Sequence, residues 1–246
     1  MTREEIYDAV QSLAVDKDLY AASEFVLGLW EETEMAKVFE DLMLDCYWKA
    51  KSVAQVIHFA NVGIHYCLAQ ACERDEDDDS ARELRFAAKR MATNAASFTW
   101  IGWEEPGVEI SPGQMRHGIA FARYAVRQLH DLDPTDAQLA FTYWYLGAHL
   151  MAEGSYPEAL SAFKQTKEFN ESAGDNPDYQ TMIEGYIGLA KILSGDDEAG
   201  ESEFDASIAA LEARDSEDAA FFTKQLVNVR VFFEKRKAAD EEAGRR

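Results

Sequence analysis

The feature that most constrains the fold of this chain is a pattern of small and large residues that occurs twice, 41 positions apart. Each copy has a large aliphatic residue followed by glycine, then a small residue twelve positions after the glycine, then phenylalanine four positions later. The first copy is Leu146, Gly147, Ala159 and Phe163, and the second is Ile187, Gly188, Gly200 and Phe204. A pattern repeated at several positions indicates a repeated structural unit.

Each copy predicts two antiparallel helices in close contact. Small residues on both helices allow their backbones to approach, and the phenylalanine one turn later fills the space beside the contact. A single helical hairpin cannot bury its apolar face alone, so such units stack on one another. The segment Glu153-Gly154-Ser155 is the expected turn of the first hairpin, and Pro157 marks the start of its second helix.

These residues resemble the tetratricopeptide repeat family, whose pattern is a large residue, Leu-Gly, a turn, Ala and then an aromatic residue. The matching residues of the first copy are Tyr143, Leu146, Gly147, Leu150, Ala159 and Phe163. The second copy departs from the pattern at Glu184 and Lys191, and the resemblance covers residues 139–214. The spacing of 41 exceeds the roughly 34 residues of the usual repeat, which implies longer helices.

The resemblance implies an all-α fold: a right-handed stack of antiparallel helical hairpins, an α-solenoid, preceded by an N-terminal helical bundle. We expect an N-terminal helical region over 1–110, repeats with a C-terminal capping helix over 111–237, and a flexible tail over 238–246. The composition, with only five prolines and many good helix formers, independently favours helix nearly everywhere. The segment from Trp100 to Gln114, with two tryptophans, is expected to be an ordered loop.

Capping residues followed by Glu or Gln three positions later mark several helix starts, and we predict about eleven helices. The pairs are Thr2 with Glu5, Ser52 with Gln55, Ser80 with Glu83, Ser111 with Gln114, and Thr135 with Gln138.

In tetratricopeptide repeats, the first helix of each hairpin lines a concave groove. Carried over to this chain, the seven groove residues are Phe141, Trp144, Ala148, Met151, Met182, Leu189 and Ile192, and Gly185, which has no side chain, stands between them at a further groove position. Family members that grip a terminal carboxylate have lysine and asparagine at such positions, whereas these residues are mostly aromatic or aliphatic. The resemblance therefore implies an apolar partner such as an amphipathic helix. The alternative is that the protein's own helices or a second copy cover these residues.

The formal net charge of −22 disfavours direct binding to nucleic acid and to anionic membranes. Within this acidic chain, six basic residues fall on two predicted helix faces: Arg82, Arg85 and Lys89 on one, and Arg116, Arg123 and Arg127 on the other. If the two helices are neighbours, these residues form a cationic patch for a carboxylate or phosphate group. The alternative is that they compensate the acidic N-terminal helices.

The acidic stretch "DEDDD" (75–79) is the strongest indication of an enzyme, because Mg²⁺ prefers several carboxylate oxygens. It falls in a predicted turn, where acidic residues also stabilise the helix that follows. His58 and His65, seven positions apart, are expected to be ordinary half-buried side chains. We identify no catalytic, cofactor-binding or metal-binding residue, and we expect no cofactor.

The sequence as a whole predicts a cytoplasmic protein-interaction scaffold that binds a protein or peptide in an apolar groove, rather than an enzyme. Its three cysteines are expected to be buried and reduced, and no apolar run is long enough to span a membrane. The sequence does not decide whether the protein forms a homo-oligomer. The alternatives are an all-helical Mg²⁺-dependent enzyme that uses residues 75–79, and a regulatory subunit of a complex associated with nucleic acid.

Overall fold

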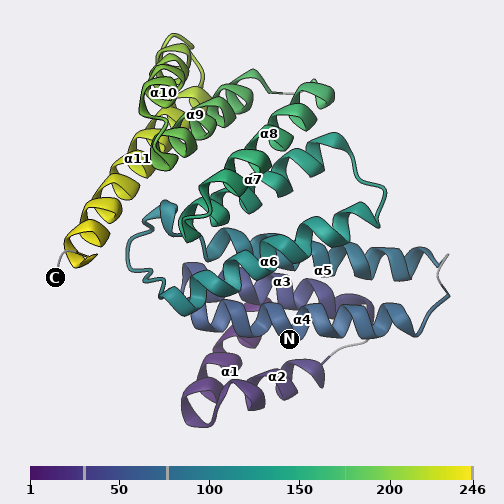
Figure 1. Ribbon diagram of the computed structural model, residues 1–246. Helices are drawn as coiled ribbons and strands as arrows, with labels where there is room; N and C mark the ends of the chain where they lie inside the picture. The colour runs from purple at the N-terminus through teal and green to yellow at the C-terminus, as the bar shows by residue number, and fades with distance from the viewer. Residues whose placement is uncertain (30–31, 76–77, 175, 245–246) are drawn as a thin grey trace. The chain divides into compact units, whose positions relative to one another are not determined.

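The computed structural model describes residues 1–29, 32–75, 78–174 and 176–244 (Figure 1). Over these ranges the chain forms eleven α-helices, one short 3₁₀ helix and no strand, which confirms the all-α class and the predicted number of helices. None of the described helices is both long enough and apolar enough to cross a bilayer. The helices belong to two compact units: unit 1 comprises residues 1–99 and 105–133, and unit 2 comprises residues 100–104 and 134–246.

Unit 1 contains the first six α-helices. They are α1 (Arg3–Asp16), α2 (Leu19–Leu27), α3 (Glu32–Trp48), α4 (Val53–Cys72), α5 (Asp79–Phe98) and α6 (Pro112–His130). Helix α4 packs against α3 and α5, and α6 packs along α5. The boundary expected at 110/111 therefore differs from the division of the structure, because α6 belongs with the helices that precede it.

The centre of unit 1 depends on a glycine in α4. A Cβ atom on Gly63 would lie 2.5 Å from the Met91 sulfur of α5 and 2.8 Å from Cβ of Phe39 of α3. Phe39, Phe59 and Met91 are completely buried there. The glycine thus admits side chains from two neighbouring helices into one layer.

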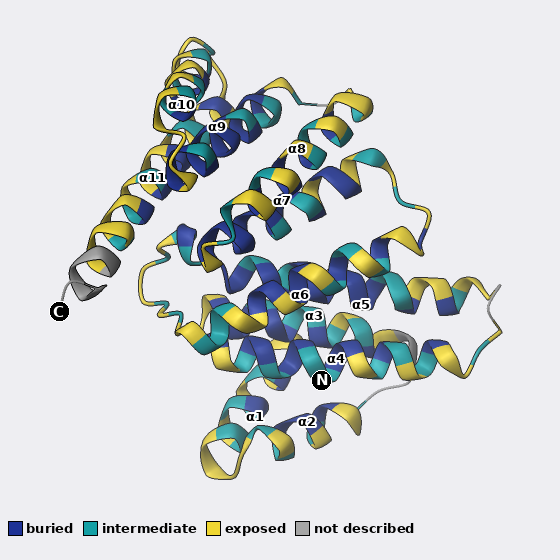
Figure 2. Ribbon diagram, viewed as in Figure 1, coloured by how far each residue is buried: buried dark blue, intermediate teal, exposed yellow. Residues whose placement is uncertain are grey.

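Unit 2 contains the 3₁₀ helix η1 and the last five α-helices. They are η1 (Ile101–Trp103), α7 (Asp136–Glu153), α8 (Tyr156–Ala173), α9 (Pro177–Ser194), α10 (Asp197–Glu212) and α11 (Glu217–Gly244). Helices α7 and α8 form one hairpin and α9 and α10 a second, and α8 packs against α9. Helix α9 is the most deeply buried, whereas α8 and α10 have exposed outer faces (Figure 2).

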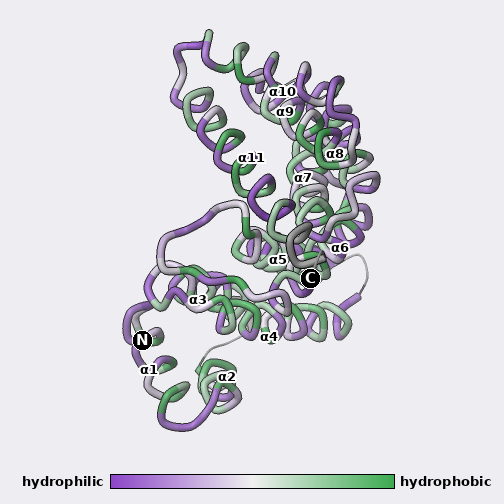
Figure 3. Tube along the Cα trace, turned by 60° about the vertical axis from the view of Figure 1, so that its left-hand side comes forward, coloured by the Kyte–Doolittle hydropathy of each residue, from purple (hydrophilic) through white to green (hydrophobic). Residues whose placement is uncertain are grey.

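Helix α11 packs against α9 and α10 and contacts η1. Hydrophobic and hydrophilic residues alternate along it (Figure 3), and Leu226, Val229 and Phe233 are buried. A Cβ atom on Gly185 of α9 would lie 2.5 Å from a Leu226 methyl group, so glycine is required where α11 crosses α9. Residues 238–244 of the predicted flexible tail are helical, because α11 continues to Gly244.

The predicted close contacts within the two hairpins are present. A Cβ atom on Gly188 would lie 2.7 Å from the backbone nitrogen of Phe204 and 2.9 Å from the carbonyl oxygen of Gly200. In the first hairpin, a Cβ atom on Gly147 would lie 2.7 Å from the ring of Phe163. The glycines therefore do stand where the paired helices approach, although different atoms meet in the two hairpins.

The helix caps agree with the sequence at four of the five predicted pairs. Reciprocal capping boxes form at Thr2, Ser111 and Thr135, and the Ser52 hydroxyl accepts a hydrogen bond from the Gln55 backbone. The prediction was wrong at Ser80. Helix α5 begins earlier because Asp78 caps it, with its carboxylate accepting a 2.8 Å hydrogen bond from the Ser80 backbone.

Candidate partner-binding cavity

Six of the seven predicted groove residues are buried inside unit 2. These are Trp144, Ala148, Met151, Met182, Leu189 and Ile192. Only Phe141 is on the surface, where 46% of it is exposed. The predicted positions therefore do not form one open groove, because the protein's own side chains cover most of them.

What remains open is a cavity of about 370 Å³ that opens on the surface of unit 2. Three of the predicted residues, Phe141, Trp144 and Met182, are among those that line it. The other lining residues are Trp103, Ala137, Tyr145, Asn170, Asn176, Tyr179, Phe221, Phe222 and Gln225. They come mainly from α7, α9 and α11, so the cavity lies along the first helix of each hairpin and the helix that follows them. We call it the aromatic cavity.

The walls of the aromatic cavity are held in place by ring contacts. The Trp144 ring packs edge-on against Tyr186 at 5.4 Å and against Tyr145 at 4.9 Å. The Trp103 ring lies 6.0 Å from that of Trp144. Tyr186 is completely buried and its hydroxyl accepts a 2.9 Å hydrogen bond from Gln225, so α9 and α11 are also joined behind the cavity.

Two aromatic rings at the cavity face solvent. Phe141 of α7 is 46% exposed and Phe221 of α11 is 57% exposed. Single exposed apolar residues are common on protein surfaces, but two phenylalanines that line the same concave site are typical of a binding surface.

Two lining residues each have a buried polar atom without a hydrogen-bond partner. The indole nitrogen of Trp144 and the hydroxyl of Tyr179 are shielded from solvent, and neither makes a hydrogen bond within the described chain. Burial, and secondarily the nearby Tyr145, raises the pKa of Tyr179 well above its usual value, so this phenol stays protonated. None of the described lining residues is charged.

Acidic residues stand at the helix starts beside the cavity. Asp136 directly precedes the lining residue Ala137, and Glu217 and Asp218 lie one turn before Phe221 and Phe222. Glu217 and Asp218 are both exposed.

The six predicted basic residues lie in unit 1, on α5 and α6, which do pack together. The prediction that Lys89 belongs to a surface patch was wrong. The residue is only 7% exposed, and burial lowers its pKa. Arg82 donates a 3.1 Å hydrogen bond to the Leu132 carbonyl and lies over the Phe86 ring. The other four are exposed or half-buried: Arg85, Arg116, Arg123 and Arg127.

These arginines do not converge on one point. The bond from Arg82 to the carbonyl of Leu132 places the start of α5 beside the end of α6. Arg127 is near that end, whereas Arg116 is eleven residues earlier, about 16 Å along the helix axis at 1.5 Å per residue. One anionic group therefore cannot bind both Arg116 and the arginines at the other end.

The acidic stretch 75–79 lies only partly within the described structure, because residues 76–77 fall outside it. Asp78 is the cap of α5, and Asp75 and Asp79 are exposed. The described residues contain no group of three or more His, Cys, Asp or Glu side chains that could hold a metal ion. His58 lies 2.7 Å from the Ser23 hydroxyl, whereas His65 is exposed.

The three cysteines are unpaired, and two are buried as expected. Burial raises the pKa values of Cys46 and Cys67 to about 12, so these thiols are poor nucleophiles. Cys72 is exposed because it is the last residue of α4, which corrects the expectation of a third buried thiol.

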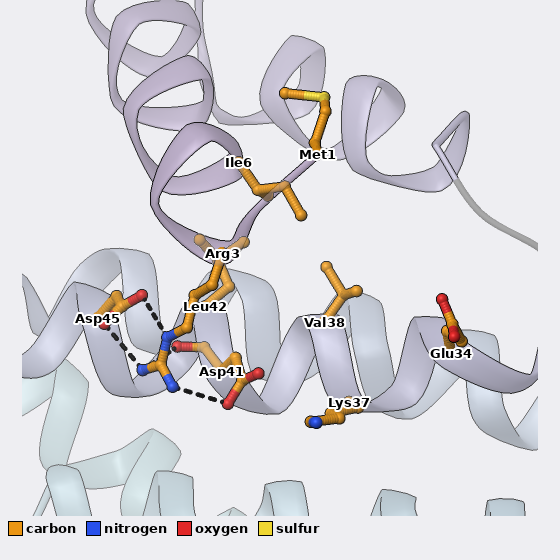
Figure 4. A pocket seen from close by; sticks show the side chains of 9 residues that line it. All are labelled: Met1, Arg3, Ile6, Glu34, Lys37, Val38, Asp41, Leu42 and Asp45. Carbon is orange, nitrogen blue, oxygen red and sulfur yellow. Dashed lines mark hydrogen bonds and ion pairs between the residues drawn. The ribbon is translucent and has the colours of Figure 1, made fainter.

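A second cavity, of about 210 Å³, lies between α1 and α3 of unit 1 (Figure 4). There Arg3 donates two 2.8 Å hydrogen bonds to Asp45 and one of 2.9 Å to Asp41. The hydrogen bonds from Arg3 hold the pKa of Asp45 below its usual value. These charges are paired within the protein, so we interpret this cavity as the structural junction of α1 with α3.

No protein-family model matches this chain, and no curated protein shows significant sequence similarity to it.

Proposed function

We propose that this protein is an interaction scaffold of the tetratricopeptide type, which binds a segment of another protein in the aromatic cavity of unit 2. In this proposal the hairpins α7–α8 and α9–α10 are successive units of a right-handed stack, and α11 is its capping helix. The single observation that carries the function is the uncharged, aromatic-lined cavity with Phe141 and Phe221 exposed at it.

The energetics favour a protein partner. Burying a phenylalanine side chain contributes about 1.5–3 kcal/mol, so covering two rings can supply much of the affinity of a transient complex. An uncharged aromatic site suits apolar side chains and not nucleic acid, which needs cations to neutralise its phosphates. We assign no catalytic residue or cofactor, and we place the protein in the cytoplasm, with its unpaired cysteines as support.

The repeated contacts support the tetratricopeptide type. Gly147 and Gly188 stand at close helix approaches, and Gly154 and Gly195 end α7 and α9 in the same left-handed conformation. Each of these pairs is 41 residues apart, which is the spacing of the sequence pattern.

The experiment is photocrosslinking from position 141. A photoreactive phenylalanine analogue replaces Phe141 in the full chain expressed in its native host, and the crosslinked partner is identified. The same experiment is repeated with Phe221→Ser, which removes the second exposed ring, and with Val227→Ser as control. Val227 is 44% exposed on the same helix but does not line the cavity. We expect a specific partner whose crosslink is lost with Phe221→Ser and kept with Val227→Ser. No specific crosslink, or equal loss with both variants, would refute the function.

A further inference from the structure

The wall of the aromatic cavity consists of rings rather than aliphatic side chains. Of the twelve described residues that line it, seven are aromatic, whereas aromatic residues make up 12% of the whole chain. No leucine, isoleucine or valine is among the described lining residues, and the other apolar side chains are those of Ala137 and Met182. The burial of apolar surface is non-directional and does not by itself favour rings over aliphatic groups. The excess of rings therefore indicates a ligand that rings attract specifically.

An aromatic ring attracts a cation to its face. The face is the negative side of the ring quadrupole, and a cation within about 6 Å of the ring centroid is stabilised most where water is excluded. In the cavity wall the plane of Tyr145 is inclined by 88° to that of Phe141 and by 75° to that of Trp144. The planes of Phe221 and Phe222 are inclined by 64°. The ring faces of the wall thus point in several directions.

The charges at the cavity also favour a cation. None of the described lining residues is charged, so no cation of the protein opposes another one there. Asp136, Glu217 and Asp218 stand at the helix starts beside the cavity, and the net charge of −22 attracts cations to the whole molecule. An anion in the same place would lose its hydration without gaining a counter-charge.

The cavity offers few hydrogen-bond acceptors to a cation that carries N–H groups. No lining residue is a carboxylate, and the three lining amides already make hydrogen bonds within the protein. Asn170 donates to Gln180 at 2.7 Å, and Gln225 donates to Tyr186 at 2.9 Å. Asn176 accepts bonds from two backbone N–H groups of α9.

A quaternary ammonium group fits this wall better than the ordinary cations of proteins. A lysine ammonium has three N–H donors and an arginine guanidinium has five, and on entering the cavity these donors would lose their bonds to water. A quaternary ammonium has the positive charge but no N–H group. Its methyl groups are apolar, so they also suit a wall without charges.

We infer that the aromatic cavity binds a quaternary ammonium group, which the partner segment carries as a trimethylated lysine. The ring faces stabilise its positive charge, and the wall covers its methyl groups. Methylation keeps the charge of a lysine while it removes the N–H donors that the cavity cannot satisfy. This inference rests on the proposed function, because it names the group that the partner inserts into the same cavity.

Three small molecules test the inference. Choline carries a trimethylammonium group, its neutral carbon analogue carries a tert-butyl group of the same shape, and ethanolamine carries a primary ammonium. Dissociation constants are measured by isothermal titration calorimetry with the full-length protein. We expect choline to bind more tightly than either of the others by roughly tenfold or more, because only choline combines charge with the absence of N–H groups. Equal binding of the neutral analogue or of ethanolamine overturns the inference.

Phe221→Leu tests whether the rings supply the attraction. Phe221 is 57% exposed, so the melting temperature should change little, and leucine remains apolar but has no ring face. The affinity for choline should fall by roughly threefold to tenfold, whereas the affinity for the neutral analogue should stay the same. The control is Phe232→Leu, which removes a half-buried ring of α11 that does not line the cavity. Unchanged choline affinity in Phe221→Leu, or an equal loss in Phe232→Leu, contradicts the inference.

The crosslink from position 141 identifies the source of the group and separates the two proposals. We expect mass spectrometry to find a trimethylated lysine in the crosslinked segment of the partner, and choline to compete with the crosslink. A specific partner without a trimethylated lysine in that segment would support the proposed function and overturn the inference. If choline does not bind, the inference is rejected, whereas the crosslink still tests the proposed function. Choline binding without any specific crosslink would reject the proposed function, and with it a trimethylated lysine as the source.

Discussion

The hairpins α7–α8 and α9–α10 have the same turn but different contacts between their helices. In both, the first helix ends at a glycine in the left-handed conformation, with φ of 86° at Gly154 and 93° at Gly195. The next residue in each turn donates a hydrogen bond back to the helix, from Ser155 to Leu150 (2.9 Å) and from Asp196 to Lys191 (3.0 Å). This is the Schellman pattern, and it reverses the chain in the same way in both hairpins.

The helix contacts differ because the small residue on the second helix differs. In α9–α10 both contact residues are glycine, and the backbones themselves meet: a Cβ atom on Gly200 would lie 2.7 Å from the backbone nitrogen of Ile192. In α7–α8 the nearest atoms to Gly147 belong to the ring of Phe163. One sequence pattern therefore has two packing solutions, backbone on backbone and backbone on ring. They are expected to respond differently to substitution.

The largest effect is expected from removing the phenylalanine of each hairpin. Phe163 is completely buried, occupies the space over Gly147 and lies 5.2 Å from the Tyr186 ring of the second hairpin. Phe163→Ala should cost about 4 kcal/mol in unfolding free energy, within the range for buried aromatic residues. Phe204→Ala should cost less, about 3 kcal/mol, because the backbone contact at Gly188 persists without its ring. Urea unfolding followed by tryptophan fluorescence measures both, and an equal or reversed order would contradict the distinction.

Gly188→Ala is expected to have the next largest effect. The added methyl group would meet backbone atoms of α10, which cannot move independently of their helix. Overpacking of this kind typically costs 1–3 kcal/mol, and the better helix propensity of alanine offsets up to about 1 kcal/mol. We therefore expect a net loss of about 1–2 kcal/mol in urea unfolding. Combining it with Phe204→Leu should not restore stability, because the obstacle is backbone; recovery in the double variant would show that a side chain is the obstacle.

How far these features follow from the sequence depends on how local they are. Four of the five predicted caps, the turn at Gly154 and the close approaches at Gly147 and Gly188 were predictable, because each depends on residues close in the sequence or within one hairpin. The burial of six predicted groove residues was not, because it depends on how α9, α11 and η1 pack against α7. Gly185 was one indication of this packing, because the structure places Leu226 against it. The sequence alone, however, does not specify which distant residue requires the glycine.

The cavity residues show the same limit. Phe141, Trp144 and Met182 were predicted because they occupy repeat positions, whereas Trp103 and Phe221 come from segments outside the repeat. The adjacent phenylalanines 221 and 222 were the feature of the sequence that indicated an exposed ring. A helix that buries one of them leaves its neighbour, about 100° around the axis, more exposed. The prediction for Lys89 was wrong for a similar reason, because the burial of its helix face depends on tertiary packing in unit 1.

Gly147→Ala should have a smaller effect than Gly188→Ala, because its obstacle is a side chain. The added methyl group would meet the Phe163 ring at 2.7 Å, and the ring can turn or shift. We expect a net loss of at most about 1 kcal/mol after the gain in helix propensity. In a double-mutant cycle with Phe163→Leu, the two substitutions should couple favourably by about 0.5–1 kcal/mol, since the smaller side chain leaves room for the methyl group. Strict additivity would mean that the ring is not the obstacle.

The smallest effect is expected at the helix ends, where an aspartate at the start of the first helix pairs with the end of the second helix. Asp136 accepts a hydrogen bond from Ser172, whereas Asp178 is bonded to Arg214 at 2.6 Å and to the Ser216 hydroxyl at 2.5 Å. The hydrogen bonds from Ser216 and Arg214 lower the pKa of Asp178 from its ordinary value of 3.8. The stabilisation is therefore complete well above pH 3.8 and is lost as the pH falls through the lowered pKa of the folded state.

Asp178→Asn tests this pairing. At neutral pH it should reduce the unfolding free energy by less than about 1 kcal/mol, as for other pairs near the surface. The difference from wild type should shrink in urea titrations below pH 3.8, where the wild-type carboxylate becomes protonated. Ser172→Ala, which removes the hydrogen bond of the first hairpin without changing a charge, is the control and should show no such pH dependence through that bond. If the difference between wild type and Asp178→Asn is constant from pH 7 to pH 2, the charged pairing does not distinguish the two hairpins.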